Sequence, residues 1–134
     1  MRTSITTNFK EEVIKAKTLA KKCVKIITDK KGLDIVVLNM EGISSLTTYF
    51  VLCSVGSDRQ AKTIAASLHE TLKKEGIRSF HKNGFRDFRW VVLDYIDVIV
   101  HIFQVDMREY YQLEKLWGDA VREDLVKKKK VSSI

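Results

Sequence analysis

Two short apolar segments constrain the fold of this chain more than any other feature. Residues 34–39 (DIVVLN) and 49–54 (YFVLCS) are rich in β-branched and aromatic side chains and are nearly continuous in apolar character. Strands of this kind are buried on both faces, as in a sheet layered with helices. The chain is therefore predicted to fold around a sheet that has helices packed against it.

An amphipathic helix is predicted before the first of these strands. Apolar residues recur at three- and four-residue steps from Val13 to Ile27, and lysines occupy most of the positions between them. Asn8 followed by Glu11 is a capping pair that predicts where the helix begins, and Gly32 predicts where it ends. The lysines form a solvated face, and a weak attraction to RNA is left open as an alternative.

A second helix is predicted after the second strand. Ser57 and Gln60 form a capping box, an apolar stripe follows at helical spacing, and Gly76 ends the pattern. A strand, a glycine and a helix start can also form a phosphate cradle, because free amides and the helix dipole face the loop. The Gly56-Ser57 loop therefore leaves open a second interpretation, a nucleotide-binding transferase-like enzyme.

Three further strands are predicted in the second half of the chain. Residues 77–80 form a short strand, and Asn83-Gly84 forms a turn. Residues 89–94 and 97–103 are two strong strand patterns joined by a tight link, so we expect an antiparallel hairpin.

A last helix is predicted from Asp106, paired with Glu109 by the same capping logic, as far as Trp117. The fold class is thus α/β, a single domain with a mixed β-sheet flanked by helices. Its predicted divisions are an N-terminal segment at 1–8, the domain at 9–123 and a basic tail at 124–134.

The net charge of +7 is distributed unevenly. Residues 1–31 carry nine basic and three acidic side chains, and four lysines stand at 127–130, whereas residues 32–126 carry eleven basic and fourteen acidic ones. The body of the domain is therefore mildly acidic, and the total charge does not by itself indicate a nucleic-acid binder.

Targeting and redox features are absent from the sequence. No apolar run approaches the roughly 18 residues of a spanning helix, and the first residues lack the apolar core of a secretory signal. Cys23 and Cys53 have no metal-binding spacing and are expected to be small buried residues. The expected location is the cytoplasm.

No catalytic or metal-binding motif emerges. His69, His81 and His101 have no ligand spacing, and His101 alternates with apolar residues, so we expect a hydrogen-bonded structural histidine. Nucleotidyltransferases hold magnesium with two carboxylates one residue apart on a strand, whereas Asp94 and Asp97 are three apart and would face opposite ways on an extended strand. We therefore predict a binding protein with no metal and no cofactor.

Residues 78–90 (RSFHKNGFRDFRW) are the most informative cluster. Basic side chains are interleaved there with Phe80, Phe85, Phe88 and Trp90. Large aromatic rings among arginines are typical of a binding hot spot. Each ring taken singly is more often part of the core, but four rings within eleven residues are not all expected to be buried.

Three blocks of sequence resemble one family, the Iojap or RsfS ribosomal silencing factors. The blocks are 47–60 (TTYFVLCSVGSDRQ), 90–101 (WVVLDYIDVIVH) and 108–120 (REYYQLEKLWGDA), in consistent order across residues 10–120. The resemblance implies a non-enzymatic factor that binds the large ribosomal subunit through ribosomal protein fourteen. It would block joining of the small subunit and repress translation under nutrient limitation.

The resemblance also implies a fold with a nucleotidyltransferase-like outline that lacks the catalytic carboxylates, and a homodimer when the protein is free. The implied partner-binding residues are Trp90, which matches the family's contact tryptophan, and its neighbours Arg89, Asp94, Tyr95 and Asp97. Family motif residues to which no role is assigned are Tyr49, Ser57, His101, Arg108, Tyr111, Glu114 and Trp117.

Three positions depart from the family pattern. Thr48 and Asn83 replace acidic residues near the implied binding face, which bears on partner affinity and specificity. Ile96 stands where the family hairpin has glycine, and an isoleucine there argues against a turn that needs a positive φ.

Overall fold

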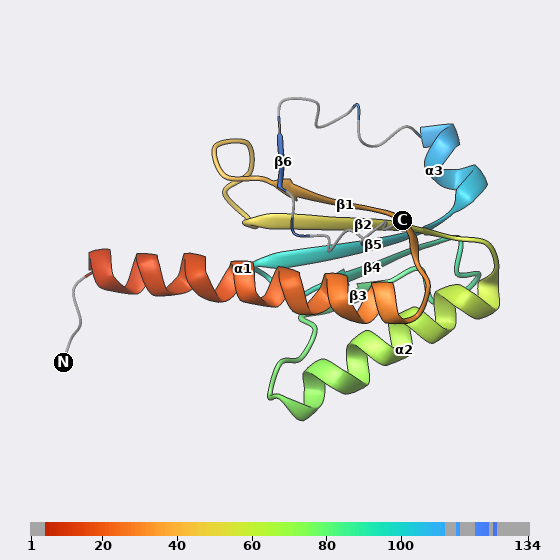
Figure 1. Cartoon of the computed structure of the whole chain (residues 1–134), viewed down its shortest axis with the longest axis horizontal. Coiled ribbons are helices and arrows are strands. Elements are labelled where there is room, and N and C mark those ends of the chain that lie inside the picture. Colours follow the sequence, from red (N-terminus) through yellow and green to blue (C-terminus); the bar gives the residue numbers. More distant parts are fainter. Residues whose placement is uncertain (1–4, 112–114, 116–119, 124, 126–134) are drawn as a thin grey trace, which may run out of the picture.

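The computed structural model describes residues 5–111, 115, 120–123 and 125 (Figure 1). Its elements are, in chain order, α1 (Ile5–Asp29), β1 (Leu33–Asn39), β2 (Tyr49–Val55), α2 (Asp58–Lys74), β3 (His81–Asn83), β4 (Trp90–Asp94), β5 (Val98–Gln104), α3 (Val105–Tyr111) and β6 (Val121–Glu123). The predicted α/β domain with a mixed sheet is confirmed.

The sheet has six strands in the order β3-β4-β5-β2-β1-β6. β2 and β5 lie at its centre and run parallel, in register from Tyr49 opposite Val98 to Val55 opposite Gln104. The other neighbours are antiparallel, including the predicted hairpin of β4 and β5. All seven residues of β2 are buried, as its apolar sequence predicts.

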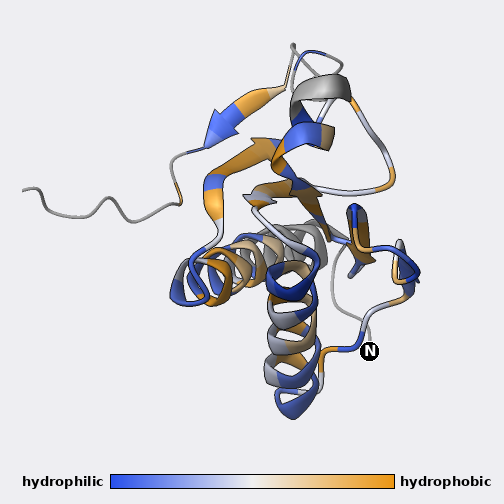
Figure 2. Ribbon diagram, turned by 90° about the vertical axis from the view of Figure 1, so that its right-hand side faces the viewer, coloured by the Kyte–Doolittle hydropathy of each residue, from blue (hydrophilic) through white to orange (hydrophobic). Residues whose placement is uncertain are grey.

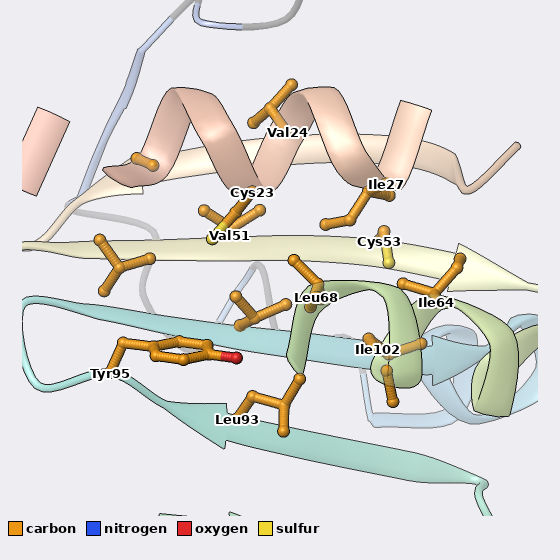
Figure 3. Close-up of a cluster of buried hydrophobic side chains, with 14 of the residues drawn as sticks. Cys23, Val24, Ile27, Val51, Cys53, Ile64, Leu68, Leu93, Tyr95 and Ile102 are labelled. Carbon is orange, nitrogen blue, oxygen red and sulfur yellow. The ribbon is translucent and has the colours of Figure 1, made fainter. Parts of the chain in front are cut away.

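Both long helices pack on one face of the sheet. Figure 2 shows α1 and α2 side by side below the strands, with their apolar sides turned toward them. Alternate residues of the strands meet these helices, since successive side chains of a strand point to opposite faces. Figure 3 shows part of this core, formed by Cys23, Val24 and Ile27 of α1, Ile64 and Leu68 of α2, and Val51, Cys53, Leu93 and Ile102 of the sheet.

The opposite face of the sheet carries a second apolar cluster. Its buried members are Val36, Leu38, Met40, Phe50, Leu52 and Phe103, and Trp90, Ile99 and Ala120 pack against them. α3 lies at one end of this face, where the Arg108 guanidinium donates to the hydroxyl of Ser54, a residue of the same face. The helices therefore do not cover the two faces equally.

Three predicted helix boundaries are confirmed and one is wrong. Ser57 caps α2 by accepting from the backbone N–H of Gln60, and Gly76, with φ +82°, follows its C-cap. At the end of α1, Gly32 donates to the carbonyl of Ile27, as a helix stop should. The start of α1 lies at Ile5, before Asn8, because an asparagine inside a helix costs only a few tenths of a kcal/mol when an upstream turn forms.

The strand predicted at 77–80 is also wrong. β3 comprises residues 81–83 instead and pairs with residues 92–94 of β4. The backbone N–H of Phe80 donates to the carbonyl of Asp94 over 2.6 Å and extends this ladder by one hydrogen bond. The position of β3 is set by the loop that returns the chain to β4, which local sequence does not reveal.

A further strand, β6, was not predicted. It adds to the outer edge of β1, where the Asn39 side-chain amide donates to Glu123 over 2.7 Å. Three residues are too short to show a strand periodicity. The predicted continuation of the last helix to Trp117 and the tail at 124–134 fall largely outside the described residues.

Neither cysteine is poised for chemistry. Cys23 and Cys53 are both free and buried, and burial raises the pKa of each thiol to about 12. None of the helices described is long and apolar enough to cross a membrane.

Tyr95 supplies a test of the helix-side core. Its ring is 6% exposed and its hydroxyl has no hydrogen-bond partner among the described residues (Figure 3). A buried hydroxyl without a partner opposes folding, so Tyr95→Phe is expected to raise the free energy of unfolding by about 1 kcal/mol in urea denaturation. The control is Tyr49→Phe, because the Tyr49 hydroxyl interacts with the Glu123 carboxylate. Removal of that hydroxyl should lower the free energy of unfolding. A loss of stability in Tyr95→Phe would contradict this prediction.

Candidate protein-binding face

β4 presents three half-buried side chains on the face of the sheet opposite α1 and α2. Trp90, Val92 and Asp94 alternate there with Val91 and Leu93, which are fully buried against the helices. At about 3.3 Å per residue, Trp90 and Asp94 lie roughly 13 Å apart along the strand. We call the surface formed by Trp90, Val92 and Asp94 the β4 face.

The orientation of Trp90 is set by an aromatic cluster. Its indole Nε1–H donates to Nδ1 of His101 over 3.1 Å, and its ring centroid lies 5.1 Å from that of Phe103. The His101 ring in turn stacks on Phe103 and contacts Phe50, with centroids 4.8 Å apart in the second pair. The expected structural role of His101 is confirmed.

His101 is held in its neutral form. Burial lowers the pKa of its imidazole to about 4, because an imidazolium would be poorly solvated there. Since Nδ1 accepts the Trp90 N–H, the proton of the neutral ring is assigned to Nε2. The Trp90 indole N–H thus donates to an uncharged acceptor at physiological pH.

The loop before β4 fixes the backbone of Trp90. Gly84, with φ +85°, approaches so closely that a Cβ there would lie 2.0 Å from the Trp90 carbonyl oxygen. Gln104 holds the other side, since its backbone N–H donates to the carbonyl of Arg89 and its amide to the carbonyl of Phe88 and to Asp58. Neither Gly84 nor Gln104 carried a functional signal in the sequence.

The turn between β4 and β5 corrects the expectation for Ile96. Asp97 N–H donates to the carbonyl of Tyr95 over 2.9 Å, and the residue between them, Ile96, has φ +73°. The Asp94 carboxylate accepts the Ile96 N–H over 2.7 Å. A positive φ is therefore present without glycine, and Asp94 and Asp97 lie on either side of a turn rather than on one extended strand.

The implied partner-binding residues do not all share one surface. Trp90, Asp94 and Asp97 are half-buried, and Arg89 is exposed with its guanidinium 3.0 Å from the Asp106 carboxylate. Tyr95 instead points into the core between the sheet and the helices. Its side chain is therefore not available to a partner of the folded chain.

The motif residues without an assigned role are largely structural where they are described. Ser57 caps α2, and burial together with the Glu123 carboxylate raises the pKa of Tyr49 to about 12. Arg108, only 8% exposed, donates to the carbonyl of Asp34 over 2.6 Å and to Ser54 over 2.9 Å. The Tyr111 backbone ends α3, and Glu114 and Trp117 lie outside the described residues.

The basic and aromatic cluster at 78–90 divides between surface and core. Phe80 and Phe85 are exposed, whereas Phe88 packs against the helix-side core and Trp90 against the opposite cluster. The prediction that not all four rings would be buried is confirmed.

The Gly56-Ser57 loop shows no open phosphate cradle. The Gly56 N–H donates to the Gln60 side chain and the Gln60 N–H to Ser57, so two of the amides a phosphate would need are taken. Asp58 adds a carboxylate in the first turn of α2, where it would repel an anion. Within the described part of the chain, no three His, Cys, Asp or Glu side chains gather as metal ligands.

The β4 face is thus a surface suited to contact with a partner, built on a mixed sheet that has two helices packed on its other face. Comparison with known proteins gives the class of protein. The family described as "Ribosomal silencing factor during starvation" matches residues 13–133. The ribosomal silencing factor RsfS of Bacillus subtilis is 43% identical over 109 residues, which cover 81% of this chain and 92% of that protein.

Solved structures agree with the sequence comparison. A crystal structure from Bacillus halodurans is 39% identical, with a TM-score of 0.65, and covers 80% of this chain and 94% of its own. An X-ray structure from Chromobacterium violaceum is 30% identical, with a TM-score of 0.69, and covers 87% of this chain and 88% of its own. The chain belongs to the RsfS/Iojap family of ribosomal silencing factors, which are non-enzymatic, ribosome-binding regulators of translation.

Gly84 provides a test of how Trp90 is positioned. Gly84→Ala would force a methyl group into the Trp90 carbonyl and add strain at a positive φ. We expect a loss of about 3 kcal/mol in the free energy of unfolding, measured in urea. Gly42→Ala is the matched control, because Gly42 also has a positive φ but open space around its Cβ position. Equal losses in the two variants would show that the close approach to Trp90 is unimportant.

The neutral state of His101 predicts a pH dependence of stability. Its pKa of about 4 in the folded chain lies below the ordinary value of 6.5, so protons bind the unfolded chain more readily. The stability that comes from keeping His101 neutral is fully present above pH 6.5. The free energy of unfolding should fall by roughly 3 kcal/mol as the pH drops to 4. Urea denaturation of wild type and His101→Gln at both pH values isolates this residue. An equal loss in the free energy of unfolding between the two pH values in both proteins would contradict the assignment of a neutral His101.

Proposed function

We propose that this chain binds the large ribosomal subunit through ribosomal protein fourteen, with the β4 face as the contact surface. The bound protein then blocks joining of the small subunit by occupying space, and represses translation under nutrient limitation. Membership of the family supports this function, and the resemblance of the block around Trp90 supports the choice of partner.

The position of Trp90 is the observation that carries the proposal. The indole is half-buried and bonded to His101, so its rotamer is fixed before any partner arrives. An anchor that is ordered in advance loses little conformational entropy on binding. Aromatic side chains held in this way are enriched among residues that dominate binding energy.

A steric mechanism agrees with the remaining features. It requires an interface of adequate area that overlaps a contact between the subunits, and it requires no catalytic group. We place the activity in the cytoplasm, where subunits join, and propose that the free protein is a homodimer. The nucleotidyltransferase-like outline of the fold likewise stays a prediction from the resemblance.

The lysines of α1 suggest a weak additional attraction to rRNA. Lys15, Lys21 and Lys25 are exposed on α1, the helix that packs on the face of the sheet opposite the β4 face. Lys22 and Lys25 are paired with Glu75 and Asp29, which reduces the charge available to phosphates. We therefore propose that this charge raises the rate of encounter with the ribosome and contributes little to the final position.

Sedimentation with large subunits tests the proposal. Trp90→Ala removes the anchor, and we expect it to lower affinity by about 2 kcal/mol or more, roughly thirtyfold, in sucrose-gradient co-sedimentation and in a subunit-joining assay. Val121→Ala is the control, since Val121 is an exposed apolar residue at the opposite edge of the sheet.

Trp90→Phe guards against misfolding, because a phenylalanine keeps an aromatic ring against Phe103 while losing the indole N–H. Circular dichroism and a thermal melt confirm the fold of each variant. If folded Trp90→Ala and Trp90→Phe both travel with large subunits as wild type does, the β4 face is not the contact surface.

A further inference from the structure

Ile96 differs from the other non-glycine residues with a positive φ. Lys31 lies in the turn that follows α1, Asp34 is of a type that tolerates the left-handed region, and Phe88 packs against the helix-side core. Ile96 is β-branched, which makes a φ of +73° a genuine outlier, and its side chain is 53% exposed. Burial within this chain does not compensate its backbone strain.

The surrounding turn forces this conformation. Tyr95 is anchored in the core on one side, and on the other the Asp97 carbonyl accepts the N–H groups of Thr48 and Tyr49, each over 3.0 Å. The Asp94 carboxylate holds the Ile96 N–H between them. The backbone would keep this shape with any residue at position 96, and glycine would adopt it without strain.

Two other exposed apolar side chains belong to the same end of the sheet. Phe80, 65% exposed, donates its N–H to the carbonyl of Asp94, and Leu46, 81% exposed, lies two residues before Thr48, which bonds to Asp97. We call Leu46, Phe80 and Ile96 the turn-end patch. Asp94 belongs to the β4 face, and its carboxylate accepts the Ile96 N–H over 2.7 Å, so Ile96 lies directly beside the end of the β4 face.

We propose that Ile96 is a specificity-determining contact residue that inserts into an apolar pocket with a basic rim on the protein partner. This inference rests on the proposed function, and it assigns to that partner the chemistry that fits the turn-end patch. The apolar Ile96 side chain requires a pocket, and the Asp94 carboxylate beside it favours cations around that pocket. A carboxylate at this turn disfavours a phosphate backbone, which favours a protein over RNA as the occupant.

Two substitutions separate strain from contact. Ile96→Ala removes most of the side chain and keeps a non-glycine residue at a positive φ, whereas Ile96→Gly removes the side chain and also relieves the strain. We expect both variants to bind purified large subunits about tenfold more weakly than wild type. Ile96→Gly should also melt about 3 °C higher than wild type, while Ile96→Ala should stay within about 2 °C.

Leu33→Ala is the matched control, because Leu33 is 51% exposed and lies opposite Ser54, at the far end of β2 from the turn. It should bind as wild type does. The inference is overturned if both Ile96 variants bind as tightly as wild type, if Ile96→Gly melts no higher, or if the variants change only self-association in light scattering.

The proposed function has its own, separate outcome in the same assay. If wild type does not bind large subunits, the proposed function fails. If wild type binds, Trp90→Ala does not and the Ile96 variants are unaffected, only the inference about Ile96 fails.

Discussion

The parallel pairing of β2 with β5 is the constraint on which the rest of this structure depends. Seven residues of each strand pair in register, and both strands are buried between two apolar layers. One layer is filled by α1 and α2, and the other by Phe50, Leu52 and Phe103 from the same strands. β4 then has a single possible place, beside β5, because the short hairpin turn joins them. The β4 face exists only because that central pair is buried.

The two faces of the sheet differ in how completely their apolar side chains are covered. On the helix side, apolar side chains are fully covered and Tyr95 is enclosed with them. On the other side, aromatic packing stops at Trp90, which is held by His101 and Phe103 and remains half-exposed. A side chain that is held rigidly by its own fold and is also exposed to solvent loses little conformational entropy when it binds a partner. The steric mechanism that we propose needs such a surface and no catalytic group.

Several features were predictable because the cause is local in sequence. The capping box at Ser57, the apolar stripes of the helices, the hairpin and the structural histidine all follow from neighbouring residues, and the structure confirms them. The start of α1, the place of β3 and the existence of β6 were not predictable in this way. Each depends on which partner a backbone segment finds, and a three-residue strand such as Val121–Glu123 has no pattern of its own.

The sequence by itself determined the alternation of helices and strands, the buried centre of the sheet and, through its three motif blocks, the family. Only the tertiary structure decided which implied contact residues reach the surface. Tyr95 and Asp97 stand on either side of Ile96. Tyr95 is buried, whereas its neighbour Ile96 is exposed and has a strained backbone. The physical reason is that the turn is held from outside itself, by the amides of Thr48 and Tyr49 and by the core around Tyr95. Such constraints come from residues far apart in sequence, so local propensity did not reveal them.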